Sequence, residues 1–305
     1  MIECFKIQLL SFDNEDEIFD IKKGKRIFGV DCLKPYAKAN PTIIVADPFL
    51  FEYKGKLHLF YESKGLYTPG VLMMTSTYDL VHWSKPVVVL KEPFHLSYPW
   101  VFEENGKVYM IPETGQDGSI RLYEATSDSL SSFRLVKKLL EQPKDKEIKM
   151  GYGDSSIYKK DGKYYLMTML QYSEPVNVLE LYISDKFEGP YTPHPSSPII
   201  ESNKVGRDAG CWIEHQGKLL RVSQDCTHRY GDNVHVSEIT KLSPTEYEEI
   251  ILKKKILPTD IPFYKEGGHQ FNVINFKGKW IVATDAKEYH RLIGTRILHK
   301  IKSKL

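Results

Sequence analysis

Three features of the 305-residue sequence predict an all-β fold. The first is a recurring hairpin in which a Gly-Lys pair separates two apolar runs. The turn glycines are Gly55, Gly106, Gly162, Gly217 and Gly278. The second is the roughly 50-residue period of these hairpins, which is typical of propellers and similar arrays. The third is the lack of helical periodicity over about 12 residues or more. Together they predict a five-bladed β-propeller with four-stranded antiparallel blades.

The first hairpin, ADPFLFEYKGKLHLFYE from Ala46 to Glu62, sets the pattern for the others. Phe49–Tyr53 and Leu57–Tyr61 fit two strands, and the Gly-Lys pair between them fits a tight antiparallel turn. Repeats of this unit predict blades that begin near residues 46, 97, 153, 207 and 268. In the third blade the outer segment, EGPYTPHPSSPI, is rich in proline and is expected to be a loop.

Residues 1–45 are interpreted as a closing segment for the ring. They contain two candidate strands, Cys4–Leu10 and Arg26–Val30, whereas only one candidate strand, Gly294–Ile301, follows Asp285. The last blade therefore lacks an outer strand, and the N-terminal strand is expected to supply it. Closure of this kind removes exposed sheet edges. We expect residues 1–305 to form a single domain.

Composition and charge argue against several functional classes. The 42 basic and 40 acidic residues leave a net charge of +2, so no overall field favours nucleic acid. The N-terminus has acids where a secretory signal needs a basic start, and no run reaches the ~20 apolar residues of a membrane span. These features predict a cytoplasmic protein that contacts neither nucleic acid nor the bilayer interior.

The four cysteines are scattered. Cys4, Cys32, Cys211 and Cys226 show no CxxC spacing, which disfavours a zinc knuckle or a dense disulfide framework. They are expected to remain reduced thiols.

Polar residues recur at fixed distances from the turn glycines. Seven positions after each turn stand Glu62, Glu113, Met169, Gln224 and Asp285. Eight positions before it stand Asp47, Tyr98, Asp154, Ala209 and Gln270, with Asp208 and His269 one step earlier in the last two repeats. Equivalent hairpin ends of a propeller converge on its axis, so these side chains are expected to share one central funnel.

The first repeat, followed by STYDLVHWSKPVVVL, resembles the opening blade of the five-bladed glycosidases of glycoside hydrolase family 43. A closer resemblance, on EPFHLSYPWVFEENGKVYMIPET, RDAGCWIEHQGKLLRVSQD and YGDNV, is to the N-terminal propeller domain of plant glucosamine inositolphosphorylceramide transferases and to bacterial proteins that consist of that domain. The plant enzymes add a C-terminal domain that resembles a glycosyltransferase. None of these three motifs belongs to that second domain, so the resemblance does not carry the transferase activity over.

The family-43 resemblance implies roles for two aspartates. Asp47, in its Asp-Pro-Phe context, matches the general base, and Asp154, in GYGDSSIY, matches the aspartate that orients and tunes the acid. The proton donor is missing, because Arg207-Asp208-Ala209-Gly210 stands where that family has a glutamate. Asp208, Glu113 or Glu62 are the alternative donors.

The remaining candidates are expected to bind substrate. Arg207 would suit an anionic group such as a uronate, phosphate or diphosphate, or would serve as a counter-charge. His269, in GGHQFN, matches the histidine at the bottom of the family's pocket; hydrogen bonding to substrate is favoured over packing and over a central cation. Tyr98, Trp100 and Trp212 would stack on sugar rings or fill the space between blades. Gln224, Asp225 and Asp285 complete the polar ring, and Glu62 is also expected to bind substrate.

The resulting hypothesis is a carbohydrate-active enzyme. It would cleave or transfer a glycosyl unit of a carbohydrate or sugar-nucleotide ligand, in surface glycan synthesis or remodelling, without a cofactor. The alternative is a noncatalytic glycan-binding module, which the missing fourth-blade glutamate favours. A scaffold for protein partners would not need converging acids.

Overall fold

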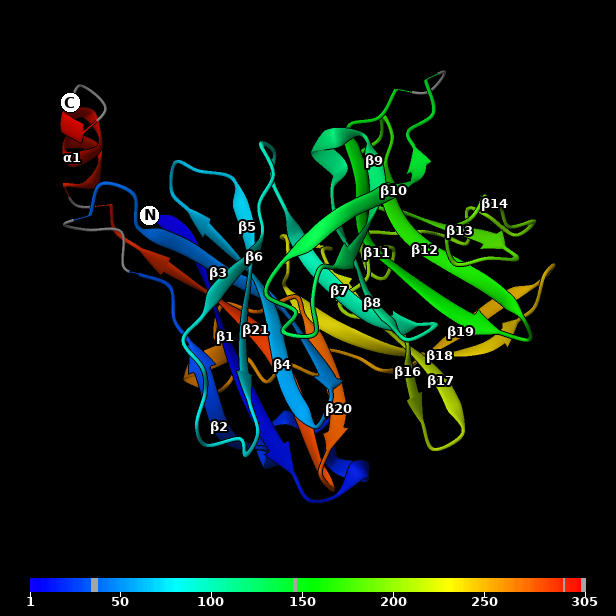
Figure 1. The fold of residues 1–305 in the computed structure, drawn as a ribbon, viewed down its shortest axis with the longest axis horizontal. Coiled ribbons are helices and arrows are strands. Elements are labelled where there is room, and N and C mark those ends of the chain that lie inside the picture. Colours follow the sequence, from blue (N-terminus) through cyan, green and yellow to red (C-terminus); the bar gives the residue numbers. More distant parts are fainter. Residues whose placement is uncertain (34–37, 145–146, 293, 303–305) are drawn as a thin grey trace. The chain divides into compact units, whose positions relative to one another are not determined.

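The structure is a computed structural model that describes residues 1–33, 38–144, 147–292 and 294–302. It confirms the predicted fold class, since the chain folds as a five-bladed β-propeller in which each blade is an antiparallel sheet (Figure 1). Within the described residues, no helix is long and apolar enough to cross a membrane.

Four sheets have four strands each, in simple meander order except for the last. The first blade holds β3 (Thr42–Tyr53), β4 (Lys56–Gly65), β5 (Gly70–Thr77) and β6 (Val87–Leu90). The second holds β7 (Ser97–Glu104), β8 (Lys107–Glu113), β9 (Ser119–Ala125) and β10 (Phe133–Glu141). The fourth holds β16 (Ile213–His215), β17 (Lys218–Asp225), β18 (Asn233–Leu242) and β19 (Tyr247–Lys253). The fifth has the order β2-β1-β21-β20.

The third sheet departs from the four-strand pattern at its outer edge. Its inner strands are β11 (Met150–Lys160), β12 (Lys163–Gln171) and β13 (Val178–Ser184). Two short strands, β14 (Thr192–Pro193) and β15 (Ile200–Glu201), both pair with β13. The proline-rich segment, expected to be a loop, therefore supplies a broken outer strand, because proline interrupts the hydrogen-bond ladder at an edge where this is tolerated.

All five predicted turns have the same backbone geometry. The residue before each turn glycine is left-handed, with φ between 49° and 53°, and the glycine follows with φ between 73° and 82°. Two consecutive positive φ values are those of a type I′ turn, which matches the twist of the flanking strands. The Gly-Lys signal in the sequence thus has a steric basis.

The N-terminus contributes two strands to the last blade. β1 (Ile2–Phe12) pairs along its whole length with β21 (Lys279–His290), and β2 (Lys25–Val30) covers the outer edge, while β20 (Phe271–Phe276) is innermost. The N-terminal strand thus closes the last blade as expected, whereas the predicted strand Gly294–Ile301 was wrong. Except for Gly294, this segment lies in the short helix α1 (Thr295–Lys302). Four 3-10 turns complete the described elements: Glu15–Glu17, Ile21–Lys23, Gly115–Asp117 and Pro262–Tyr264.

Contacts divide the chain into two compact units. Unit 1 is Met1–Ser97 with Leu257–Leu305 and holds the first and fifth blades; unit 2 is Tyr98–Ile256 and holds the other three. The expectation of one domain over residues 1–305 stays a prediction.

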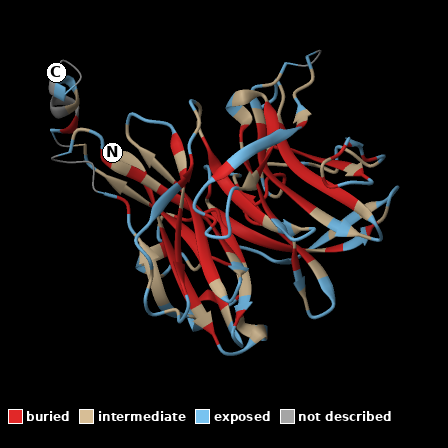
Figure 2. Ribbon diagram, in the orientation of Figure 1, coloured by how far each residue is buried: buried red, intermediate tan, exposed pale blue. Residues whose placement is uncertain are grey.

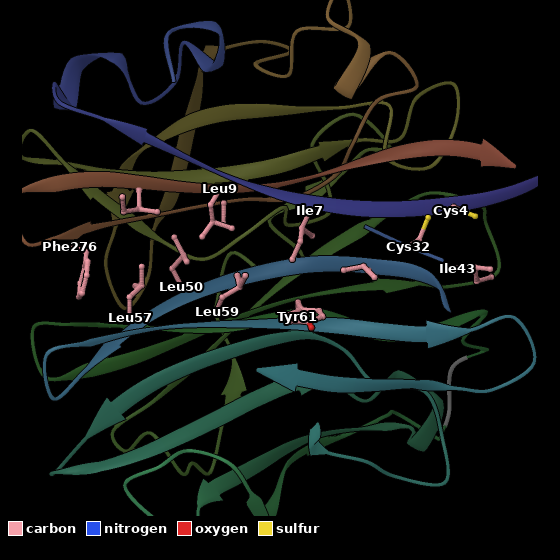
Figure 3. Packing of buried hydrophobic residues seen from close by; sticks show 13 residues of the cluster. Cys4, Ile7, Leu9, Cys32, Ile43, Leu50, Leu57, Leu59, Tyr61 and Phe276 are labelled. Atoms are coloured by element: carbon pink, nitrogen blue, oxygen red, sulfur yellow. The ribbon is translucent and has the colours of Figure 1, made fainter. Parts of the chain in front are cut away.

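Burial follows the strand centres, and exposure follows the turns (Figure 2). In unit 1 a core cluster joins alternate residues of β1, among them Ile7 and Leu9, to Leu57 and Leu59 of β4 (Figure 3). The residue between the first two, Gln8, is also buried and donates a hydrogen bond to the Tyr264 hydroxyl at 2.8 Å. Both faces of the strand are therefore covered, as in a sheet stacked between others. Truncating such a buried leucine typically costs about 2–5 kcal/mol.

Candidate functional site

Asp47 and Asp154 occupy equivalent irregularities in two different blades. The register of β3 against β4 shifts between Ala46 and Phe49, and that of β11 against β12 shifts between Gly153 and Ser156. Each aspartate lies inside the shift with φ of 52°. Tyr98, at the same distance from its turn in the second blade, has φ of 47°. Bulges of this kind redirect a side chain out of the alternating pattern, and left-handed backbone often marks a functional position.

In unit 1, Asp47 belongs to a buried group that we term the histidine cluster (Asp47, His269, Asp285). His269 Nε2 lies 3.1 Å from Asp47 Oδ1, and His269 Nδ1 lies 2.8 Å from Asp285 Oδ2. The Asp285 carboxylate also accepts the backbone N–H groups of Asp47, His269 and Gln270, at 2.8–3.3 Å. Asp285 therefore fixes both the ring and the bulge that carries Asp47.

The charge state of His269 follows from these contacts. Burial lowers its pKa, but the carboxylates of Asp285 and Asp47 outweigh burial and raise the pKa well above its ordinary value. A protonated ring carries a hydrogen on both nitrogens, which leaves no lone pair for a metal. The ligand atoms of the three residues lie within 4.8 Å of one another, as a cation site would require, yet the protonated ring already supplies the positive charge.

Three further residues, Glu62, His95 and Gln270, complete the polar surroundings in unit 1. Glu62 Oε1 lies 3.5 Å from His95 Nε2, and His95 Nδ1 accepts the Gly70 N–H at 3.0 Å. Burial lowers the pKa of His95 to about 4, so the Glu62 contact involves a neutral ring. Both side-chain polar atoms of Gln270 lack a hydrogen-bond partner within the described residues. A buried amide of this kind commonly binds ordered water or a ligand group.

In unit 2, Asp154 belongs to what we term the arginine cluster (Asp154, Arg207, Glu113, Gln224). Arg207 Nε donates to Asp154 Oδ2, and its Nη2 lies 3.4 Å from Glu113 Oε2. Gln224 Nε2 donates to the same Asp154 oxygen at 3.0 Å and to the Asp208 carbonyl at 2.7 Å. Burial lowers the pKa of Arg207, but Asp154, Tyr230 and Glu113 outweigh it and raise the pKa well above its usual range.

Arg207 also lines a pocket of about 480 Å³. The Tyr230 ring centroid lies 5.0 Å from the guanidinium carbon, and Met150, Asn177 and Asn203 are further lining residues. Two larger pockets of unit 2, of about 650 and 630 Å³, are lined by none of the predicted site residues. The smaller pocket is the more informative one, because a buried charged side chain forms part of its wall.

Asp208 lies in a second, largely buried group, the Arg221 triad (Asp208, Arg221, Glu249). Arg221 donates to Asp208 Oδ1 at 2.8 Å and makes two bonds of 2.7 Å to Glu249. Two carboxylates share one cation, so the triad has an excess negative charge only when both carboxylates are ionised. Burial raises the pKa of Asp208 to about 7, although Arg221 acts in the opposite direction.

The other predicted residues of unit 2 lie apart from these contacts. Asp225 Oδ2 lies 3.3 Å from His235 Nε2. The Tyr98 hydroxyl donates to the Gly210 carbonyl, and Trp100 stacks on Phe102 with ring centroids 4.5 Å apart. Trp212 stacks on Tyr158 at 5.2 Å. The two tryptophan contacts are packing contacts, and the Asp225 contact is a buried one between a carboxylate and an imidazole. The proposed substrate roles of these residues stay predictions.

The structure thus brings together the predicted residues of each unit: Asp47 with His269 and Asp285, and Asp154 with Arg207, Glu113 and Gln224. Convergence of both sets on one funnel spans the two units and stays a prediction. Sequence reasoning missed His95, Tyr230, Arg221 and Glu249. Only Arg221 gave a signal, since a charged residue inside the apolar run of KLLRVSQ needs a buried partner.

Comparisons with known proteins agree with the observed fold. Solved structures with similar folds include a family 117 glycoside hydrolase from Zobellia galactanivorans, with TM-score 0.56 and 14% identity over 80% of this chain and 84% of that one. A thermostable family-43 glycoside hydrolase gives TM-score 0.56 and 14% identity over 82% and 91% of the two chains. At these identities the likeness concerns the fold alone.

The chain has a higher sequence identity to plant proteins than to these solved structures. The chain is 34% identical over 228 residues to glucosamine inositolphosphorylceramide transferase 1 of Arabidopsis thaliana, and 33% identical over 226 residues to that of Oryza sativa subsp. japonica. Each alignment covers 72% of this chain but only 29% of the relative. The family described as glucosamine inositolphosphorylceramide transferase 1, N-terminal, matches residues 28–286. On the extent of that match, the chain belongs to this family.

Proposed function

We propose that the chain is a carbohydrate-active enzyme that cleaves or transfers a glycosyl unit, with Asp47 as the general base. The observation that carries the proposal is the pair of equivalent bulges that present Asp47 and Asp154 with φ of 52°. The fold is similar to that of glycoside hydrolases, and the plant relatives are named glucosamine inositolphosphorylceramide transferases. Both kinds of relative act on carbohydrates.

The histidine cluster would position Asp47 for this role. His269 holds one carboxylate oxygen, and the Asp47 backbone is fixed by Asp285, so the second oxygen has a defined direction. A general base needs this fixed geometry to accept a proton from water or from an acceptor hydroxyl. In unit 2, Arg207 and the pocket beside it would bind the anionic part of the ligand, such as a phosphate or uronate.

A noncatalytic glycan-binding module is the second candidate, and a specific observation favours it. Asp208 stands in the segment where family 43 has its proton-donor glutamate. It is 1% exposed and bound by Arg221. A side chain in that position has no path to a glycosidic oxygen. If the chain is an enzyme, Glu113 would then be the remaining candidate for the proton donor in unit 2, and its side chain is 19% exposed.

The first prediction separates these two functions. A panel of neutral glycans, uronates, sugar phosphates and nucleotide sugars is screened for binding by thermal shift, and the best ligand is incubated with the protein and acceptors. We expect products by mass spectrometry, and a loss of about 10²–10⁴-fold in rate for Asp47→Asn, because the amide cannot accept the proton. Asp13→Asn is the matched control, since the Asp13 side chain is 93% exposed.

Two results would contradict the hypothesis that the chain is an enzyme. One is a tightly bound ligand that the wild type leaves unchanged on prolonged incubation, which assigns the binding module. The other is an Asp47→Asn variant with wild-type turnover. Arg207→Ala should weaken binding of the anionic ligands alone, with Arg134→Ala, 66% exposed, as control. Equal affinity of Arg207→Ala and wild type would leave Arg207 as a counter-charge.

A further inference from the structure

A second group of potential ligands lies in unit 1, apart from the histidine cluster. The sulfur atoms of Cys4 and Cys32 and a ring nitrogen of His290 all lie within 4.8 Å of one another. Cys4 is in β1, Cys32 follows the end of β2, and His290 is the last residue of β21. Figure 3 shows the Cys4 and Cys32 side chains next to each other at the end of the core cluster. Residues that are distant in sequence thus form one compact group.

Glu288 completes the group, which we term the thiol cluster (Cys4, Cys32, Glu288, His290). Its Oε1 lies 3.2 Å from Cys32 Sγ and 2.6 Å from His290 Nε2. Cys4 lies directly opposite Glu288 in the β1–β21 register, so the ladder itself fixes their separation. Glu288 Oε2 is bound by Lys6 at 2.7 Å. The carboxylate is therefore held from outside the cluster, as a metal ligand usually is.

The donor set and its spacing match those of zinc. Two thiolates, one imidazole and one carboxylate are ligands that zinc accepts in a tetrahedral site. Bonds of about 2.0–2.3 Å place neighbouring ligand atoms of such a site about 3.3–3.8 Å apart. The ligand atoms of Cys4, Cys32 and His290 already lie within 4.8 Å of one another, so they need shifts of about an ångström, within reach of side-chain rotation. Glu288 Oε1 is 3.2 Å from Cys32 Sγ and 2.6 Å from His290 Nε2, so it can join them by a similar shift.

Charge and burial agree with the same ion. Two thiolates and one carboxylate bring three negative charges, and a divalent cation with the Lys6 ammonium brings three positive charges. Cys4 is 0% exposed and Cys32 is 7% exposed, so uncompensated thiolates would be costly there. His290 and Glu288, with side chains 17% and 26% exposed, leave the cluster open on one side. An ion can therefore enter without unfolding the sheet.

We propose that Cys4, Cys32, Glu288 and His290 bind one zinc ion. The ion would join the first strand of the chain, the segment after β2 and the end of β21, which are the three pieces that close the fifth blade. Its role would be structural, because four protein ligands leave no open position for substrate. This site is independent of the function proposed for Asp47.

The experiment uses the full chain, purified with reductant and stripped with a chelator. Zinc is added back, unbound metal is removed, and bound metal is measured by mass spectrometry. Cobalt is added in a parallel sample to detect thiolate-to-metal charge-transfer absorption. We expect about one zinc per chain, cobalt absorption in the near ultraviolet, and a higher melting temperature with zinc because only the folded protein presents the ligands together.

Cys4→Ser, Cys32→Ser and His290→Ala should each lose stoichiometric zinc, the cobalt bands and the zinc-dependent rise in melting temperature. Cys211→Ser and Cys226→Ser, in unit 2, should keep all three. Circular dichroism of each metal-free variant checks that it is folded. Absence of zinc binding in the folded, reduced wild type overturns the proposal, and so does zinc binding that survives Cys4→Ser with Cys32→Ser. A Cys4–Cys32 disulfide whose reduction yields no zinc binding also overturns it.

Discussion

In both units a cationic side chain holds a buried carboxylate that lies in a bulge, but the cation differs between the units. In unit 1 a carboxylate in the bulge, Asp47, is held by His269, and in unit 2 its counterpart Asp154 is held by Arg207. A histidine can lose its proton within an accessible pH range, whereas arginine stays charged. Unit 2 also contains the Arg221 triad, in which a second arginine is enclosed between two carboxylates. The difference indicates a titratable centre in unit 1 and a permanently charged one in unit 2.

The largest expected effect tests the permanent charge of unit 2. Arg221→Met should lower the free energy of unfolding by about 3–5 kcal/mol, because it leaves the buried carboxylates of Asp208 and Glu249 without a cation. Chemical denaturation measures the change. Lys241→Met is the control in the same pair of strands, since its bond to Glu248 is exposed and should contribute less than about 1 kcal/mol.

If Arg221→Met does not fold, Arg221→Lys keeps the charge and should lose less. An Arg221→Met variant as stable as wild type would mean that the triad carries no buried ionic interaction, and the comparison between the units would fail.

The second effect tests the titratable centre of unit 1. The pKa of His269 lies well above its ordinary value, so its contribution to stability is complete below about pH 6.5 and is lost as pH rises through the raised pKa. The expected slope is up to about 1.4 kcal/mol per pH unit above pH 6.5. His269→Gln should remove this part of the slope, as measured by denaturation across the pH range.

His58→Gln is the matched control for that measurement. His58 is also buried in unit 1, but burial lowers its pKa to about 4, so it is neutral above pH 6.5 in the folded and unfolded chain alike. Its removal should shift the curve without changing the alkaline slope. The same slope in His269→Gln and wild type would contradict a protonated His269.

A third effect concerns the pH dependence of stability that arises in unit 2, which is expected in a lower pH range than that of His269. The pKa of Asp208, raised by burial to about 7, means that folding favours its protonated form. Its contribution is therefore complete below about pH 4 and is lost as pH rises to about 7. Asp208→Asn resembles the protonated form and should flatten this decline. Asp13→Asn, exposed, should not. An unchanged decline in Asp208→Asn would show that Asp208 is ionised throughout.

The smallest expected effect concerns the type I′ turns, which are present in both units. Gly55→Ala and Gly162→Ala each place a side chain in a type I′ turn with φ of 73° or 75°, where an added Cβ has no atom within 4 Å. The cost is therefore backbone strain alone, about 1 kcal/mol in either unit. Thermal unfolding of both variants measures it. A difference of more than about 1 kcal/mol between them would show that the turns are not equivalent.

Local features explain how much could be predicted from the sequence. Glycine-containing type I′ turns and alternating strands depend on steric preferences of a few neighbouring residues, so five hairpins and the fold class followed from the repeat. The fixed offsets from each turn glycine also located Asp47 and Asp154, because the hairpin sets their distance from the turn. The helix at Thr295–Lys302 was missed, since a short apolar run does not distinguish a strand from a helix.

By itself, the sequence determined the repeat, the turns and the residues that occupy equivalent hairpin positions. Only the tertiary structure decided which cation holds which carboxylate, because His269, Arg207 and Arg221 reach their partners through pairings between distant segments. The same holds for the thiol cluster, where Cys4 and Cys32 meet through the pairing of β1 with β2 and β21. Spacing along a chain describes neighbours in one strand or turn, whereas charges and ligands interact across strands.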